Sequence, residues 1–516
     1  MTEKQITILV AFCVYMLIMI LIGTLSSKNK NNEDYFLGGR GLGSWTAALS
    51  AQASDMSGWL LMGLPGAIYI AGTGEVWIAI GLLIGTILNW YLVARRLRKY
   101  TIVSNNSLTI PSFFENRFHD KSGILKIAAS LIIIVFFAVY TASAFSSGAK
   151  LFANVFGTSG DDKTMYLVGL TIAATVILVY TFMGGFKAVC YTDFVQGILM
   201  LIAILAVPII AYVGLTGEFG SVTNALSAHG VEDPAGYLSL MKDSSGNTIT
   251  ATSIISNLGW ALGYFGMPHI LIRFMAIRSD AEVKKSRVIA IVWVILSLSA
   301  ASFLGIFARG FLKETLDSTT SETVFIKTIL QIFDGNFVLI FIGGIFLCGI
   351  LAAIMSTADS QLLVTASAVS EDMYKGAINK KASEKSSLLV GKIAVVVVAV
   401  IAYLIALDPT SSIMGLVSNA WAGFGAAFGP VVLLSLFWKR FNLPGAVAGM
   451  VTGAGFVIFW DYIKIGEATL GSSTGIYSLV IGFFLAALVA VVVTLITKAP
   501  SKEICDEFDK VNTVEI

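Results

Sequence analysis

The chain has 516 residues, of which 56% are hydrophobic and only 13% are charged, with a formal net charge of +2. A soluble domain carries roughly 25% charged residues, so this composition excludes an ordinary soluble protein. Unbroken apolar runs recur along the whole chain and predict an all-α polytopic membrane protein. The four cysteines are dispersed and predict neither a disulfide framework nor a metal site.

Thirteen apolar runs are each long enough to cross a bilayer, which takes about 20 residues. The first is too long for a signal-peptide core and is expected to stay in the protein. The predicted spans are 6–26, 45–71, 75–94, 125–155, 164–183, 188–214, 252–277, 287–310, 337–372, 389–407, 411–438, 443–461 and 474–497.

The second predicted span contains a carboxylate, Asp55, between two serines and close to Gly58. A charge at the centre of a bilayer costs about 2.5–3.5 kcal/mol or more, so it needs a partner or a water-filled cavity. No lysine or arginine lies near the middle of another span, which makes a structural ion pair unattractive. A helix interrupted at Ala53–Ser57 would also free carbonyl oxygens, which suit a small hard cation. We therefore expect Asp55 to serve a bound cation.

Two spans carry helix-breaking residues at mid-depth, namely 45–71, with its Ser-Gly and Leu-Pro-Gly strings, and 252–277, with several glycines and Pro268. They lie five spans apart, so spans two to six and seven to eleven form two five-helix units of opposite orientation. This pattern predicts an inverted-repeat transporter whose site lies where the repeats meet. The expected organisation is an extra helix and loop (1–44), a first repeat (45–214), an inverted second repeat (252–438), two further helices (439–497) and a tail (498–516).

Span nine contains a second polar group, Ser356 and Thr357, beside Ala353. Hydroxyls within helices commonly bond to the carbonyl one turn back. Placed against the carbonyls of the broken second span, they would instead supply neutral oxygens for a sodium ion.

Aromatic residues flank both interruptions and could line a pocket for a compact, mostly apolar solute, whose carboxylate would meet the amide dipoles of the half-helices. Aromatic rings in membrane spans are also common as core or interface residues. The candidates are Trp59, Tyr140, Trp260 and Tyr264.

The basic residues are distributed unevenly over the predicted loops, because about 26 of the 34 Lys and Arg fall on one side. The positive-inside rule makes that side cytoplasmic. With thirteen spans, the N-terminus is then expected outside and the C-terminus in the cytoplasm.

Five strings resemble the sodium/solute symporter family, and within it the branch that transports proline. They are EDYFLGGRGLG (33–43), ALSAQASDMSGWLLMGLPGA (48–67), GWALGYFGMPHILIRFMA (259–276), ILAAIMSTADSQLLV (350–364) and LVSNAWAGFGAAFGPVVL (416–433). The resemblance implies a LeuT-like five-plus-five inverted repeat with two broken helices. It also implies sodium-coupled import of L-proline across a bacterial plasma membrane, with Na⁺ as coupling ion and no other cofactor.

The resemblance also implies roles for particular residues. A sodium ion would be held by the carbonyls of Ala53, Met56 and Ala353 and the hydroxyls of Ser356 and Thr357, with Asp55 needed for sodium affinity. The implied substrate region comprises Ser57, Gly58, Trp59, Tyr140, Trp260, Tyr264 and Pro268. Met267 departs from the polar residue expected in the GYFG-x-PH string.

Arg40 matches an arginine tied to coupling, although a snorkelling anchor is the alternative. Asp359 and Ser360 replace less acidic neighbours and, with Asp193, predict a second, inner sodium site.

Other functions stay open at this point. The solute could be pantothenate or a monocarboxylate instead of proline, and a channel or a solute sensor would belong to a different class. An enzyme is not expected, because the three histidines are dispersed and no acid–base pair is convincing. Nucleic acid is not an expected partner, and the sequence does not indicate an oligomeric state.

Overall fold

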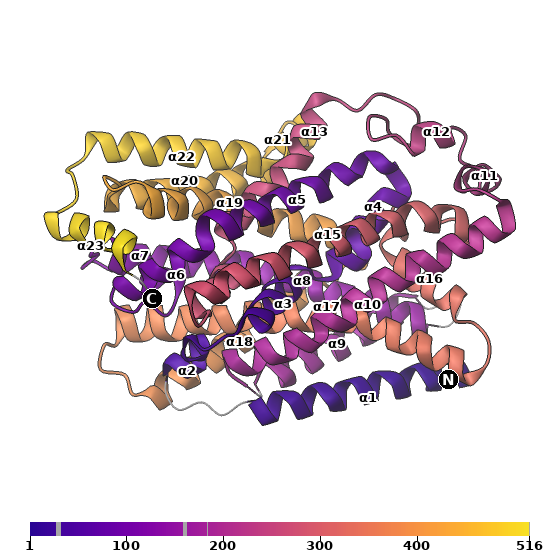
Figure 1. Cartoon of the computed structure of the whole chain (residues 1–516), viewed down its shortest axis with the longest axis horizontal. Coiled ribbons are helices and arrows are strands. Elements are labelled where there is room, and N and C mark those ends of the chain that lie inside the picture. Colours follow the sequence, from indigo (N-terminus) through magenta and orange to yellow (C-terminus); the bar gives the residue numbers. More distant parts are fainter. Residues whose placement is uncertain (27–31, 158–161, 183, 515–516) are drawn as a thin grey trace.

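The structure, a computed structural model, describes residues 1–26, 32–157, 162–182 and 184–514. Nearly all of them are helical (Figure 1). In chain order the first half contains α1 (Glu3–Ser26), α2 (Asn32–Leu37), η1 (Gly38–Arg40), α3 (Ser44–Asp55), η2 (Trp59–Gly63), α4 (Leu64–Ala71), η3 (Thr73–Glu75), α5 (Val76–Leu88), η4 (Asn89–Val93), α6 (Ala94–Val103), α7 (Ile110–Arg117), α8 (Ile124–Phe156), α9 (Asp162–Thr181) and α10 (Phe186–Phe219).

The second half contains α11 (Val222–Ala228), α12 (Pro234–Tyr237), α13 (Ala251–Leu258), η5 (Gly259–Gly266), α14 (Pro268–Ala276), α15 (Asp280–Phe311), η6 (Ser321–Thr323), α16 (Val324–Ile332), α17 (Phe337–Ser367), η7 (Ala368–Ile378), α18 (Glu384–Ile405), α19 (Ile413–Phe437), α20 (Leu443–Tyr462), β1 (Lys464–Ile465), β2 (Ala468–Thr469), α21 (Leu470–Thr474), α22 (Ser478–Ile496) and α23 (Lys502–Thr513). The two short strands pair antiparallel, Lys464 with Thr469 and Ile465 with Ala468.

Within the described residues, eleven helices are long and apolar enough to cross a membrane. The two interrupted elements, α3–η2–α4 and α13–η5–α14, complete the thirteen spans predicted from the sequence. Both interruptions were expected, and both occur. The predicted second-repeat span 287–310 begins earlier than expected, at Asp280, because Ser279 caps the helix by accepting a hydrogen bond from the Glu282 amide.

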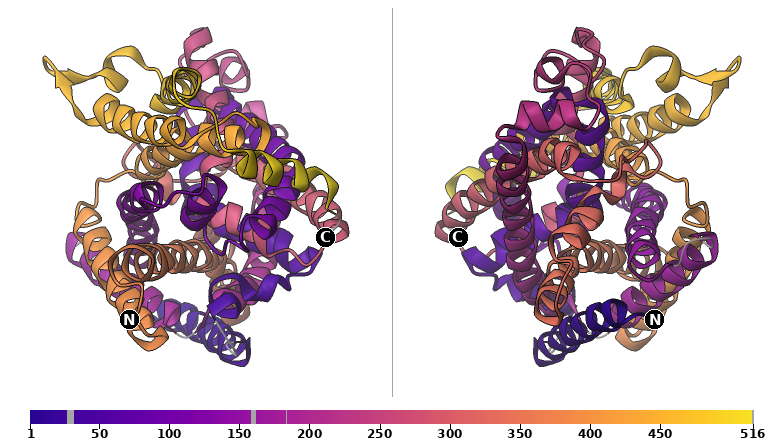
Figure 2. Two further views of the ribbon diagram at one scale, coloured as in Figure 1. Left: turned by 90° about the vertical axis from the view of Figure 1, so that its left-hand side faces the viewer. Right: turned by 90° about the vertical axis from the view of Figure 1, so that its right-hand side faces the viewer.

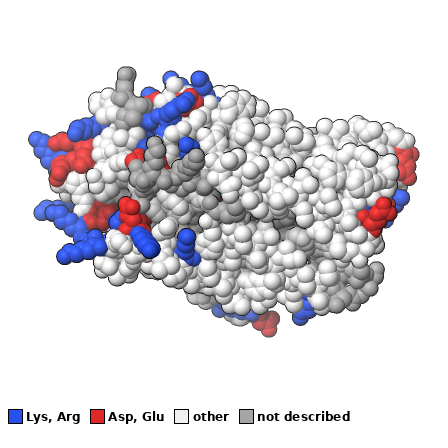
Figure 3. All heavy atoms as spheres, turned by 90° about the horizontal axis from the view of Figure 1, so that it is seen from below, with Lys and Arg blue, Asp and Glu red and all other residues white. Residues whose placement is uncertain are grey.

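The helices run roughly along the long axis of the molecule, and views down that axis show most of them end-on (Figure 2). The two termini lie at opposite ends (Figure 1), as an odd number of spans requires. Lys and Arg gather at one end of the face shown in Figure 3, and the middle of that face is almost free of charge. This is the surface expected of a protein whose waist contacts hydrocarbon.

The interrupted elements lie inside the bundle. α3 packs against α10, α15 and α17, and η5 packs against α5 and α19. Side chains on α1 that face outward are apolar, such as Leu17 at 66% and Leu25 at 71% exposure. A group of buried polar side chains lies where α3, α14 and α17 meet.

Candidate functional site

The first interruption frees backbone carbonyls because two amides change their partners. In a continuous helix the amide of Ser57 would donate to Ala53 O, but here it donates to Asp55 O at 3.1 Å. The amide of Leu60, which would donate to Met56 O, donates to Ser57 O at 3.1 Å. Both carbonyls are therefore left without the amide donor that helical geometry assigns to them.

Helix α17 presents its hydroxyls to one of these carbonyls. Ser356 Oγ donates to Ala53 O at 2.7 Å, and Thr357 Oγ1 lies 3.4 Å from the same oxygen. Ser356 Oγ also lies 3.3 Å from Ala353 O, one turn back on its own helix. Ser356 thus makes both contacts considered from the sequence, and all these residues are buried. An oxygen-rich point forms where α3 and α17 cross.

Asp55 lies at the end of α3 and is fully buried. One carboxylate oxygen accepts a hydrogen bond from Tyr264 OH at 2.7 Å, and the other has no partner among the described residues. The backbone carbonyl of Asp55 accepts from Trp59 Nε1 at 3.0 Å and from Tyr140 OH at 3.2 Å. A buried carboxylate with one unpaired oxygen attracts a cation, because unpaired polar atoms are costly in a low dielectric.

The aromatic residues expected around the solute separate into two groups. Trp59, Tyr140 and Tyr264 converge on Asp55, whereas Trp260 lies beyond them toward one end of the molecule. Trp260 stacks on Tyr477 with ring centroids 5.2 Å apart and lines an open vestibule of about 660 Å³. The vestibule walls come from both broken helices, through α4, α13 and η5, from η3 and α5, and from α19, α20, α21 and α22.

Trp421 of α19 was not anticipated from the sequence. Its ring packs edge-on against Tyr264 with centroids 5.0 Å apart, and its Nε1 donates to Trp260 O at 2.8 Å. It therefore joins the two aromatic groups. The string SNAWAGFG around it was noted only for its family resemblance, and a lone buried Trp gives no other signal.

Arg273 of α14, which sequence reasoning missed, is the centre of a second buried polar cluster that contains the expected Asp193, Asp359 and Ser360. It donates to Asp193 Oδ2 at 2.9 Å, to Ser50 Oγ at 3.0 Å and to Ser360 Oγ at 2.5 Å. Asp359 joins through Ser360, whose hydroxyl lies 3.3 Å from its carboxylate. One oxygen of each aspartate lacks a partner among the described residues. The cluster contains two carboxyl groups and one guanidinium.

The remaining expected residues lie in distinct places. The Arg40 guanidinium is held within the protein and does not extend freely as a snorkelling side chain would. It donates hydrogen bonds of 2.8–3.1 Å to Asn106, Thr101, Met275 O and Ser107 O. It belongs to the end of the bundle and not to the Arg273 cluster.

Four positions lie where the backbones bend or approach each other. A Cβ at Gly58 would collide with Ser147 of α8, so glycine allows the two helices to touch. Met267 is buried at the second break, and Pro268 begins α14 directly after it. Ser57 Oγ lies 3.5 Å from the Trp59 amide.

Comparison with known proteins gives a consistent result. The model of the sodium:solute symporter family matches residues 35–453. The sodium/proline symporter of Escherichia coli (strain K12) is 44% identical over 96% of this chain and 94% of its own length. The osmoregulated proline transporter OpuE of Bacillus subtilis (strain 168) is 43% identical over 96% of each chain.

Two solved structures share the architecture. A Na⁺-coupled sialic acid symporter, in a substrate-bound outward-open state, superposes with a TM-score of 0.74 at 18% identity, covering 96% of this chain and 99% of the other. MhsT in complex with L-phenylalanine gives a TM-score of 0.51 at 13% identity, covering 87% of this chain and 97% of the other. The predicted LeuT-like fold is thereby confirmed.

Proposed function

The chain belongs to the sodium:solute symporter family, and we propose that it imports L-proline together with Na⁺ by alternating access. The observation that carries the proposal is the identity of 43–44%, over nearly the whole chain, to relatives named as proline transporters. The buried site supports it, because it combines cation-attracting oxygens with an aromatic wall. Multi-pass membrane transport, not catalysis, is the role that this combination favours.

For the sodium ion we propose the carbonyls of Ala53, Met56 and Ala353 with the hydroxyls of Ser356 and Thr357. The freed carbonyls and the hydroxyl contacts to Ala53 O support this set. Neutral oxygens are suitable ligands for a hard cation that must also leave. Asp55 is fully buried and lies two residues from Ala53. Its carboxylate supplies a negative charge that favours the ion without being one of the ion's direct ligands.

For the solute we propose the region beside Asp55, comprising Ser57, Gly58, Trp59, Tyr140, Trp260, Tyr264 and Pro268. Proline has a compact ring of mostly CH₂ groups, and its burial against aromatic rings contributes about 0.8 kcal/mol per CH₂. Its ammonium gains roughly 1–2 kcal/mol over a ring face. The amide dipoles at the ends of the half-helices can receive its carboxylate.

Asp55 supports a direct coupling between the two ligands. Its carbonyl is held by Trp59 and Tyr140, and its carboxylate by Tyr264. Sodium bound to the neighbouring carbonyls stabilises the geometry of the break, and with it the aromatic wall. By linkage, the solute must then raise sodium affinity by the same factor.

A second cation at Asp193, Asp359 and Ser360 remains part of the proposal. The presence of two carboxyl groups beside one guanidinium supports it, although Arg273 already uses the Ser360 hydroxyl. Sodium would bind there only through the two carboxylate oxygens that lack partners.

We further propose that the protein lies in the bacterial plasma membrane with its N-terminus outside and its C-terminus in the cytoplasm. The basic loops and the charged end in Figure 3 support this orientation. In this arrangement residues 45–214 and 252–438 are the two inverted repeats, and 439–497 are peripheral helices. Arg40 would belong to the cytoplasmic closure, where it ties η1 to α6 and α14.

Uptake of labelled L-proline into proteoliposomes tests the proposal. One Na⁺ carried with a zwitterion moves one charge, worth about 2.3 kcal/mol per 100 mV. A tenfold sodium gradient adds about 1.4 kcal/mol, so the two together support on the order of 500-fold accumulation. Uptake should need sodium and respond to voltage. Displacement of proline by micromolar pantothenate or a monocarboxylate would overturn the substrate, and sodium-independent uptake would overturn the mechanism.

A further inference from the structure

The C-terminal helix α23 is docked on the body of the protein, beside α6 and α7 (Figure 1). Its apolar face is buried, and Phe508 packs edge-on against Tyr100 with centroids 6.1 Å apart. Beyond its end, Val514 O accepts a hydrogen bond from Lys99 Nζ at 2.6 Å. The segment therefore has a fixed position relative to the loop that follows α7.

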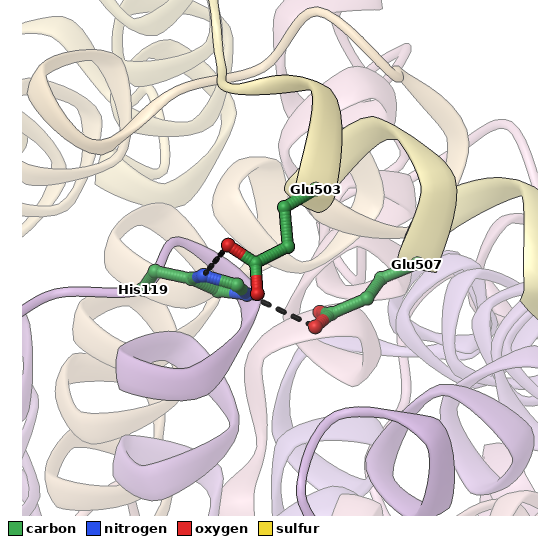
Figure 4. A group of neighbouring side chains, drawn as sticks. All are labelled: His119, Glu503 and Glu507. Carbon is green, nitrogen blue, oxygen red and sulfur yellow. Dashed lines mark hydrogen bonds and ion pairs between the residues drawn. The ribbon is translucent and has the colours of Figure 1, made fainter.

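Three side chains with metal-ligating atoms meet where α23 faces that loop (Figure 4). Glu503 and Glu507 are four residues apart and so lie on the same face of the helix. Both face His119, whose Nε2 lies 3.1 Å from Glu507 Oε1 and whose Nδ1 lies 3.7 Å from Glu503 Oε2. One ligand atom from each residue lies within 4.8 Å of the other two.

Among the described residues, the two carboxylates of this cluster form no ion pair with a lysine or an arginine. Two carboxylates that face one imidazole favour a positive charge between them, which a bound cation can supply. Lys439 pairs with Asp509 at 2.5 Å. Arg117 acts on Glu507 electrostatically, but it forms no ion pair within the described residues and its guanidinium stacks on aromatic rings.

We propose that His119, Glu503 and Glu507 bind a first-row divalent cation of the Zn²⁺ type. Zinc accepts imidazole nitrogen and carboxylate oxygen at 2.0–2.2 Å, so two of its tetrahedral ligands lie roughly 3.3 Å apart. The 3.1 Å between Nε2 and Glu507 Oε1 is close to that spacing. Glu503 faces the other ring nitrogen, Nδ1, and would join an ion on Nε2 by a rotation of its exposed side chain. Mg²⁺ and Ca²⁺ prefer sites made only of oxygen. Glu503 is largely exposed, which leaves room for water as a fourth ligand.

A bound cation would fasten α23 to the loop after α7 and so affect the transport cycle, a consequence that rests on the proposed function. α23 packs on α6, and Arg98 of α6 donates to Ile277 O at 2.6 Å and Arg278 O at 2.8 Å, just beyond α14. The inner half of the second broken helix is thus linked to the tail. Fastening the tail restrains this half-helix and slows release of solute to that side.

Binding is tested on the full chain, purified without a polyhistidine tag, by titrating Zn²⁺ against a chromophoric chelator. One equivalent should bind saturably, and His119→Gln, Glu503→Gln and Glu507→Gln should each weaken binding at least tenfold. Two control variants, Asp506→Asn on α23 and His229→Gln at the other end of the molecule, should bind as the parent does. Equal binding by His119→Gln, or no saturation below millimolar Zn²⁺, overturns the site.

The consequence for transport is tested by adding Zn²⁺ to the α23 side of proteoliposomes that take up proline. Initial uptake should fall several-fold for the parent and for Asp506→Asn, but not for His119→Gln. Zinc that binds in the chelator assay but leaves uptake unchanged overturns the fastening role. Absence of proline uptake before zinc is added argues only against the proposed function, because the binding assay does not depend on it.

Discussion

In the first broken helix the interruption is confined to Met56–Gly58, whereas the second tightens into the eight-residue 3₁₀ helix η5 before it breaks at Met267. The short break places a carboxylate and freed carbonyls against the hydroxyls of α17. The long one places Trp260 and Tyr264 against Trp421 of α19. The first helix is thus suited to a cation and the second to an apolar surface.

The difference indicates that the first broken helix serves the cation and the second serves the solute. One hydrogen bond connects the two helices. Tyr264, from the second helix, donates to Asp55 of the first at 2.7 Å. Variants of the first helix should therefore change sodium affinity first and proline affinity by linkage. Variants of the second should change proline affinity first. The expected effects decrease in the order Asp55, Thr357, Trp260 and Tyr264.

Asp55→Ala should have the largest effect. It removes the buried carboxylate at the first break and leaves Tyr264 OH without its acceptor. Removing one partner of a buried charged contact costs roughly 3–5 kcal/mol, so the sodium concentration for half-maximal uptake should rise at least 100-fold. Asp55→Asn keeps the size of the side chain and an oxygen that can accept from Tyr264 OH. Its loss of sodium affinity therefore measures the effect of the charge alone. Uptake with normal sodium dependence in both purified variants would refute the role of Asp55.

Thr357→Ala should raise the half-saturating sodium concentration about tenfold, since loss of one buried oxygen ligand costs roughly 1–3 kcal/mol. Thr365→Ala is a suitable control, because that hydroxyl is buried on the same helix but bonds only to Gln361 O within it. Sodium-dependent uptake at saturating proline distinguishes the two variants. An equal shift in both would mean that Thr357 acts through the stability of α17 and not as a ligand.

Trp260→Ala should lower proline affinity about tenfold and sodium affinity much less. The ring forms the outer aromatic wall, and its burial contributes on the order of 1.5–3 kcal/mol. Trp460→Ala, which removes a ring near the periphery that bonds Ile476 O, should leave both affinities unchanged. Binding of labelled proline at fixed, saturating sodium measures the effect. A larger loss of sodium affinity than of proline affinity would contradict the division between the helices.

Tyr264→Phe should have the smallest effect, about three- to tenfold on both ligands, because a hydrogen bond to a charged group contributes about 1.5–3 kcal/mol and water can partly replace it. Its signature is that proline and sodium affinities fall together, since this hydroxyl joins the two helices. Tyr140→Phe, which removes a bond to the Asp55 carbonyl, provides a comparison. A change in only one ligand's affinity would show that Tyr264 does not link them.

Thirteen spans, both broken helices and the polar groups at Asp55, Ser356 and Thr357 follow from the sequence. Hydrophobic length and mid-span glycine and proline are local signals, and bilayer thickness gives them a fixed scale. The family resemblance extended these signals to particular ligands. Arg273 and Trp421 were missed, because their environment consists of residues far away in the sequence, such as Asp193 and Tyr264.

The sequence by itself determined where the chain crosses the membrane and where its helices break, since these depend on the transfer energy and backbone chemistry of adjacent residues. Only the tertiary structure decided which oxygens meet. Ala53 and Ser356 are about 300 positions apart, yet 2.7 Å separates their oxygens. The same holds for His119 and Glu507 at the docked tail. Such contacts depend on how helices pack and cross, which hydrophobic periodicity along one helix does not encode.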